Sequence, residues 1–176
     1  VAANRNSAIE VRGEPGKPVS NIVFSGITIT QTATTFMETY EVPSGGDWAL
    51  YRGSALFVDG PADQIEVSNC MFDQVGGNAL MFSNDVSNSR IVNNSFVNIG
   101  ESAVLMVGSS KLVNATRGAG RIPSRNTIAN NLVDTVGVFG KQTSAYFKSL
   151  SDSNILRDNV FFNGPRAGVN FNDGGP

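Results

Sequence analysis

A short phrase of apolar and polar residues recurs along the chain. Each copy begins with an apolar residue, carries Asn or Asp at its third position, and ends on an aromatic or apolar residue. The clear copies are Val67–Phe72, Ile91–Phe96, Ile128–Val133 and Leu156–Phe161, and Val23–Thr28 is a weaker first copy. Because Val67 and Ile91 are 24 residues apart, the pattern predicts a coil of roughly 24 residues that is repeated with insertions.

A second apolar phrase keeps step with the first. It opens on Ala, usually shortly after a Gly, in the runs Ala55–Val58, Ala79–Phe82, Ala103–Met106, Ala145–Phe147 and Ala167–Phe171. A single coil cannot bury its apolar side, whereas stacked coils share parallel ladders about 4.8 Å apart and enclose a continuous core. We therefore predict an all-β fold, a right-handed parallel β-helix of about five coils. A leucine-rich repeat has a similar period, but its characteristic leucine spacing does not recur here.

The repeat accounts for the whole chain as one domain, residues 1–176, with insertions at about 31–52 and 108–125. Loops that leave a repeat fold usually lie over one face of it. A parallel β-helix exposes strand edges at both ends. We expect the sequence to be truncated at both ends, so that further coils, a cap or a partner chain cover these edges.

The Asn residues of the repeat fall into two predicted columns. Stacking places Asn69, Asn93, Asn130 and Asp158 in one column and Asn94, Asn131 and Asn159 in the next. An Asn amide has both a donor and an acceptor and tolerates a left-handed backbone, so such a column can hydrogen-bond along the axis. We interpret these residues as a turn ladder in preference to a binding site.

Alternation along the Ala-initiated strands predicts which side chains face outward. With Phe57, Met81, Leu105 and Phe147 pointing inward, the outward set is apolar in the early coils and polar in the later ones. The outward set is Leu56, Val58, Leu80, Phe82, Val104, Met106, Tyr146, Lys148, Arg166, Asn170 and Asn172. An exposed apolar patch of this size needs a cover. The aromatic-rich insertion at residues 31–52 is the nearest candidate.

Composition excludes several classes of function. The chain has a net charge of −2 and no clustered Lys or Arg, so it lacks the basic stripe that nucleic acid binding needs. No apolar run approaches the roughly 20 residues that span a bilayer. With one Cys and no His, a Cys/His zinc site and a His-based triad are excluded. We expect no cofactor, because the run of alternating Asp residues typical of many Ca²⁺ loops is also absent.

Three phrases carry a resemblance to a known group of proteins. They are Tyr40–Trp48, Phe72–Asn78 and Phe162–Gly174, and they resemble right-handed β-helix proteins of the pectin-lyase-like superfamily over nearly the whole chain. The resemblance implies an extracellular or cell-surface protein. It also implies a polysaccharide lyase or glycoside hydrolase, although the superfamily includes members without enzymatic activity.

Candidate chemistry follows from what a lyase would need, namely a base and positive side chains beside a uronate carboxylate. Without His, the candidate catalytic residues are Arg166, Lys148 and Tyr146. Arg166 lies on a glycine-flanked turn, and its alternative role is an ion pair with Asp173 or Glu101. The candidate substrate-binding residues are Asn170, Asn172, Asp173, Lys141 and Glu101.

A glycoside hydrolase would instead need two carboxylates roughly 5–10 Å apart. Four acidic residues lie near the ends of the apolar runs: Glu101, Asp173, Asp85 and Asp59. Their positions are compatible with such a carboxylate pair but do not identify one. Asn114 and Asn93 each begin an N-glycosylation pattern.

Two hypotheses remain open at this point. The first is a secreted or surface β-helix that binds or processes an acidic polysaccharide. The second is a structural module of an extracellular filament, spike or larger assembly, which the absence of His and of a complete catalytic pair favours.

Overall fold

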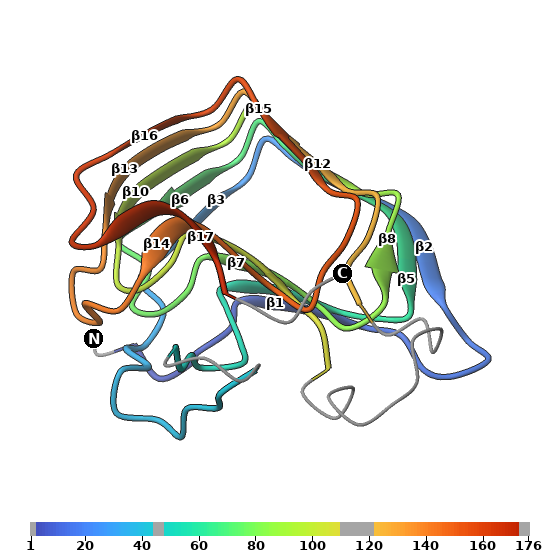
Figure 1. The fold of residues 1–176 in the computed structure, drawn as a ribbon, viewed down its shortest axis with the longest axis horizontal. Helices are drawn as coiled ribbons and strands as arrows, with labels where there is room; N and C mark the ends of the chain where they lie inside the picture. The colour runs from blue at the N-terminus through green and yellow to red at the C-terminus, as the bar shows by residue number, and fades with distance from the viewer. Residues whose placement is uncertain (1–2, 44–47, 110–121, 173–176) are drawn as a thin grey trace.

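The computed structural model describes residues 3–43, 48–109 and 122–172. These residues form 17 short β-strands and contain no helix. The strands form three parallel sheets, an arrangement consistent with a parallel β-solenoid (Figure 1). The all-β prediction is confirmed, as is the parallel pairing of repeated strands. No helix in this part of the chain is long and apolar enough to cross a membrane.

Each round of the chain contributes one or two strands to each sheet. The first sheet has the order β1 (Ile9–Arg12), β4 (Leu56–Asp59), β7 (Leu80–Ser83), β11 (Val104–Val107), β14 (Ser144–Ser149) and β17 (Ala167–Phe171). The second has the order β2 (Val19–Ser25), β5 (Ala62–Ser68), β9 (Arg90–Val92), β12 (Thr127–Ala129) and β15 (Ile155–Arg157), and β8 (Val86–Ser87) pairs with β5. The third has the order β3 (Thr28–Thr30), β6 (Met71–Asp73), β10 (Ser95–Ile99), β13 (Leu132–Val136) and β16 (Val160–Phe162).

The pairing register reproduces the repeated phrases. Val67 pairs with Ile91, Ile91 with Ile128, and Ile128 with Leu156, so these starts share one column. The first copy is the exception and is wrong by one residue. Phe24 pairs with Val67, while Val23 pairs with Glu66 and is 62% exposed. The first copy lacks the Asn pair that marks the register in later coils. The prediction there rested on apolar character alone, which does not fix the register to the residue.

The assignment of inward and outward faces is wrong for β4, β7, β11 and β14 of the first sheet, whereas on β17 Asn170 lies on the outer side as predicted. The predicted outward residues Leu56, Leu80 and Val104 belong to the main core, together with Val58, Phe82, Met106 and Tyr146. The predicted inward residues Phe57, Met81, Leu105 and Phe147 instead form a second cluster with Trp48 and Leu50. Both sides of this sheet are apolar because the insertion at residues 31–52 packs on its outer side, so alternation alone does not distinguish them. These contacts confirm that the insertion covers the outer side of the sheet. The side chains that it covers are those predicted to point inward.

The two Asn columns are present and differ in their role. Asn69, Asn93, Asn130 and Asp158 all have φ between 54° and 59°, in the left-handed region, and all are exposed. Asn94, Asn131 and Asn159 form the hydrogen-bonded ladder. Nδ2 of Asn94 donates to Oδ1 of Asn131 at 3.0 Å, and Nδ2 of Asn131 donates to Oδ1 of Asn159 at 2.9 Å. The turn-ladder interpretation is confirmed for this second column.

Candidate functional site

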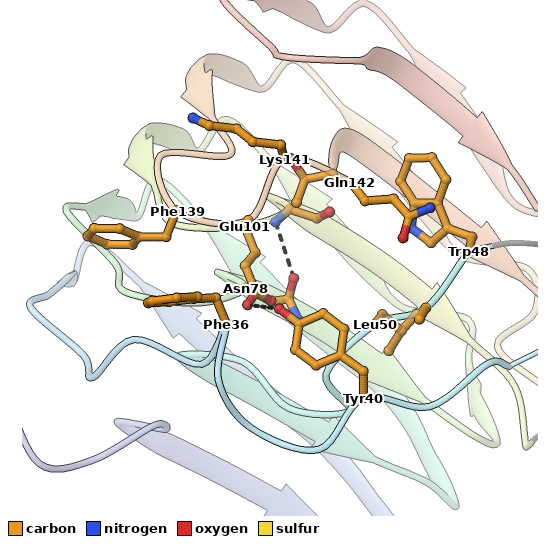
Figure 2. Close-up of a pocket in the computed structure, with 13 residues that line it drawn as sticks. Phe36, Tyr40, Trp48, Leu50, Asn78, Glu101, Phe139, Lys141 and Gln142 are labelled. Atoms are coloured by element: carbon orange, nitrogen blue, oxygen red, sulfur yellow. Dashed lines mark hydrogen bonds between the residues drawn. The ribbon is translucent and has the colours of Figure 1, made fainter.

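A small pocket lies where the insertion at residues 31–52 meets the turns that enter the first sheet. Its volume is about 220 Å³. The insertion contributes Phe36, Tyr40, Trp48, Ala49 and Leu50, and the rest of the lining comes from the solenoid (Figure 2): Asn78, Glu101, Ser102, Phe139, Gly140, Lys141, Gln142 and Thr143. Asn78 and Glu101 precede the strands β7 and β11, and residues 139–143 form the turn between β13 and β14.

Glu101 joins the insertion to the solenoid. Its Oε1 accepts a hydrogen bond from the Thr35 hydroxyl at 2.9 Å and a second one from the Tyr40 hydroxyl, which Figure 2 shows. The Glu101 side chain is buried, with a residue exposure of 2%. Gly77 permits this close approach, because a Cβ at that position would lie 2.3 Å from Oγ1 of Thr35. The carboxyl group therefore fixes the wall of the pocket that carries Tyr40.

Arg52 provides a second anchor for the insertion. Its Nε donates to Glu41 at 2.7 Å, while its guanidinium also bonds Oγ of Ser83 at 2.9 Å and the carbonyl oxygen of Gly108 at 2.8 Å. The pair with Glu41 is only partly exposed. A planar guanidinium suits such a multiple contact. The insertion is thus attached to the solenoid at both of its ends.

Burial controls the ionisation of the two groups that meet in the pocket. Desolvation raises the pKa of the Glu101 carboxyl, and the hydrogen bonds from Tyr40 and Thr35 oppose this effect because they favour the charged form. Desolvation also raises the pKa of the Tyr40 hydroxyl, and its hydrogen bond to Glu101 adds to the rise. Tyr40 is therefore a hydrogen-bond donor throughout the physiological pH range, while Glu101 is a carboxyl group that gains a proton more readily than usual.

Asn78 is a buried amide whose groups are all in use. Its Nδ2 donates to the carbonyl oxygens of Tyr51 at 3.0 Å and Gly53 at 3.1 Å, and its Oδ1 accepts from the backbone nitrogen of Ser102 at 3.2 Å. Figure 2 shows the last of these bonds. Asn78 therefore supports the floor of the pocket. It offers little hydrogen-bonding capacity to a ligand.

Aromatic rings line the pocket on two sides. Phe36 and Phe139 stack with their centroids 6.1 Å apart and an angle of 20° between their planes, and they are 46% and 48% exposed. Trp48 is buried between Phe147, whose ring centroid is 5.7 Å away, and the Arg166 guanidinium, 4.8 Å from the Trp48 centroid. The faces of the Trp48 ring are therefore already covered. The Phe36–Phe139 pair is the aromatic surface that is open to a ligand.

Two of the predicted binding residues line this pocket, and one predicted catalytic residue lies beside it. Glu101 and Lys141 are in the lining, and Arg166 covers Trp48. The ammonium of Lys141 donates to the carbonyl oxygens of Gly137 at 2.6 Å and Val138 at 3.1 Å. Among the described residues, neither Lys141 nor Arg166 takes part in an ion pair.

The other two candidate catalytic residues lie on the opposite side of the sheet from Arg166. Tyr146 packs in the main core, where burial raises the pKa of its hydroxyl. Lys148 pairs in register with Met106, and its ammonium donates to the carbonyl oxygen of Ser151 at 2.7 Å. Since residues 146 and 148 share the inward face, the structure does not bring them together with Arg166.

The remaining predicted residues are spread along the last strand and the surface. Asn170 pairs in register with Phe147, on the outer side of the first sheet, and Asn172 is buried directly after β17. Asp173 and Asn114 lie outside the described residues. Asn93 is exposed, at a turn with φ 59°.

Of the acidic residues considered for a hydrolase, Asp59 and Asp85 do not form a pair with Glu101. Glu101 precedes β11, whereas Asp59 ends β4 and Asp85 follows β7. These positions are at opposite ends of strands that run in parallel. Asp59 accepts hydrogen bonds from Asn84 at 2.5 Å and Arg12 at 3.3 Å. In the described parts of the chain, no three acidic or Cys side chains are grouped so as to hold a metal ion.

Sequence reasoning missed Phe139 and Gln142. The signal for Phe139 is an apolar pair, Val138 and Phe139, between Gly137 and Gly140 in a turn. An apolar pair in such a loop has no place in the core. Gln142 carries no comparable signal.

No protein-family model, curated protein or solved structure matches the chain. The resemblance to the pectin-lyase-like superfamily therefore stays a prediction.

Proposed function

We propose that this protein is an extracellular or cell-surface right-handed β-helix that binds an acidic polysaccharide, with one sugar unit held in the pocket at the 31–52 insertion. The observation that carries the proposal is the combination of an open aromatic pair, Phe36 and Phe139, with a buried carboxyl group and two cations. A right-handed coil is inferred because crossovers between parallel strands of one sheet have that hand in nearly all cases.

The size and lining of the pocket suit a single ring. Ligand pockets combine apolar or aromatic walls with a few oriented polar groups. At about 220 Å³ the pocket is smaller than the roughly 300–1,000 Å³ typical for drug-sized ligands. A sugar ring presents C–H groups to an aromatic surface and hydroxyl groups at its edge, which matches Phe36 and Phe139 on one side and Glu101 and Gln142 on the other.

The charges around the pocket favour an acidic sugar. Lys141 and Arg166 are exposed cations beside the pocket, and the described residues provide no carboxylate within ion-pair distance of either. An arginine fork is suited to a carboxylate, and a lysine acts as a point charge. The carboxylate of a uronate is an anion of the kind that both side chains bind.

Binding without cleavage is the form of the proposal that the residues support. Hydrolysis by the usual mechanism requires two carboxylates across the sugar, and Glu101 is the one carboxyl group in the described lining. Elimination requires a base beside the uronate. The side-chain nitrogen of Lys141 donates hydrogen bonds to the carbonyl oxygens of Gly137 and Val138.

Isothermal titration with oligogalacturonate and with the corresponding neutral oligosaccharide tests this function. We expect the uronate polymer to bind and Phe139→Ala to weaken binding about tenfold or more, with Arg166→Ala acting in the same direction. Phe162→Ala is the matched control, because Phe162 is similarly exposed, at 45%, but lies on β16 in another sheet. Absence of binding, or equal effects of Phe139→Ala and Phe162→Ala, would contradict the proposal.

A structural role in a larger assembly is the second candidate, and one observation favours it. The inward columns of the first sheet end in Val169 and Phe171, which are 44% and 66% exposed. Large apolar side chains exposed at a sheet edge are typical of association sites. We expect Phe171→Lys to reduce any self-association seen by light scattering. A chain that stays monomeric at high concentration would argue against this role.

A further inference from the structure

The geometry points to Glu101 as a proton-dependent specificity residue, which donates a hydrogen bond from Oε2 to an anionic ligand when it is protonated and repels that ligand when it is ionised. This inference rests on the proposed function of the pocket, since it concerns how the same site selects its ligand.

The two oxygens of the Glu101 carboxyl group are not equivalent. Oε1 accepts the hydroxyl hydrogen bonds from Thr35 and Tyr40. No donor among the described residues bonds Oε2. An oxygen that already accepts two hydrogen bonds is a poor place for a proton, so a proton on this carboxyl group goes to Oε2. Because Glu101 lines the pocket, Oε2 is the oxygen that a ligand there can meet.

The two protonation states treat a ligand in opposite ways. A protonated carboxyl group is a donor through its O–H, whereas the ionised group only accepts. A hydrogen bond from Oε2–H to a ligand carboxylate is charge-assisted and strong. The ionised form faces the same carboxylate as a like charge, and because Glu101 is buried this repulsion is stronger than in bulk solvent. An acidic ligand therefore binds with uptake of one proton, which the solvent supplies.

The described titratable and charged groups near Glu101 are the Tyr40 hydroxyl and the cations Lys141 and Arg166. From the insertion, Thr35 is neutral and Tyr40 keeps its proton because its pKa is raised. From the turn between β13 and β14, Lys141 is the charged group that shares the lining. Arg166 lies over Trp48 and is the second cation beside the pocket. Burial raises the pKa of Glu101, and the hydrogen bonds from Tyr40 and Thr35 oppose this rise.

The test compares affinities for digalacturonate and for the neutral galactose disaccharide between pH 5 and pH 8, for the wild type and for Glu101→Gln. One proton changes the affinity by at most tenfold per pH unit, and we expect digalacturonate to bind about tenfold more tightly at pH 5 than at pH 8. The neutral disaccharide should show no such dependence. The amide of Glu101→Gln is a permanent donor, so this variant should keep the low-pH affinity for digalacturonate at every pH.

The outcomes separate this inference from the proposed function. Wild-type binding without pH dependence, or pH dependence that persists in Glu101→Gln, would overturn the inference and leave the saccharide site in place. Failure of every probe to bind at any pH would remove both. If Glu101→Gln does not fold, the carbon-13 resonance of the wild-type Glu101 carboxyl group decides. Its titration midpoint must rise when digalacturonate binds, and an unchanged midpoint would contradict the inference.

Discussion

Replacing Asn131 by Ala should destabilise the solenoid far more than any change at its neighbour Asn130. The Asn131 side chain, with a residue exposure of 2%, accepts hydrogen bonds from the backbone nitrogen and Nδ2 of Asn94, each at 3.0 Å. It donates to the Ile91 carbonyl oxygen and to Oδ1 of Asn159, each at 2.9 Å. The substitution breaks these four bonds and leaves two buried backbone groups without their side-chain partner.

The expected loss follows from the number of these bonds. At about 1 kcal/mol for each hydrogen bond, with a larger cost for a buried group left unsatisfied, Asn131→Ala should lower the free energy of unfolding by about 3–5 kcal/mol. Asn130 is exposed with φ 56°, and none of the side-chain hydrogen bonds in the described structure includes it. Gly adopts that backbone conformation freely. Asn130→Gly should therefore change the stability by less than about 1 kcal/mol.

Urea unfolding followed by far-ultraviolet circular dichroism measures both changes. The slope of the free energy against urea should stay constant if the folded and unfolded states are otherwise unchanged. A loss below about 1 kcal/mol for Asn131→Ala, or equal losses for the two variants, would refute the ladder as a main source of stability.

Three further predictions concern the insertion and its anchors. The raised pKa of Glu101 means that the folded state favours the protonated carboxyl group. The resulting contribution to stability is fully present below the unfolded pKa and is lost as pH rises through the folded pKa. Glu101→Gln should remove this pH dependence from the midpoints of urea unfolding. Arg166→Ala should shift the fluorescence of Trp48, the single Trp of the chain, because the guanidinium covers its ring; an unchanged spectrum would contradict this contact. Arg52→Ala should cost about 1–3 kcal/mol and increase proteolysis within the insertion, because the bonds to Glu41 and the solenoid are lost. Arg90→Ala, which removes a largely exposed pair with Glu66, is the control and should have little effect.

The repeat was predictable because stacking requires like residues at like positions. Val67, Ile91, Ile128 and Leu156 lie in one column as their spacing indicates. The ladder of Asn94, Asn131 and Asn159 follows from the same argument. In a translational repeat, each residue contacts the equivalent residue one coil away, so the spacing of the repeat identifies the contact. This is why the sheets and the internal polar ladder could be read from the sequence.

The faces of the first sheet could not be read in this way. Phe57 and Leu56 are equally apolar, and both are buried, one under the insertion and the other in the main core. Period-2 alternation identifies a face only where one side is polar. The error moved Tyr146 and Lys148 to the outside, and the proposed grouping of these two residues with Arg166 followed from it.

The pocket depends on contacts between segments that do not repeat. Glu101 contacts Thr35 and Tyr40, which are 66 and 61 residues away in the sequence. Phe36 meets Phe139 across a still larger separation. No periodicity relates these positions, so the sequence identified individual members such as Glu101 and Lys141 without indicating that they meet the aromatic residues of the insertion.

The most direct test of the saccharide site is a map of chemical-shift changes on the isotope-labelled protein during titration with oligogalacturonate. We expect saturable shifts to be concentrated at Tyr40, Phe139, Lys141 and Gln142 and at the indole of Trp48. The resonances of Phe162 on β16 should not move. Shifts that are absent, or that are concentrated around Phe162 and away from the insertion, would contradict the proposed saccharide site.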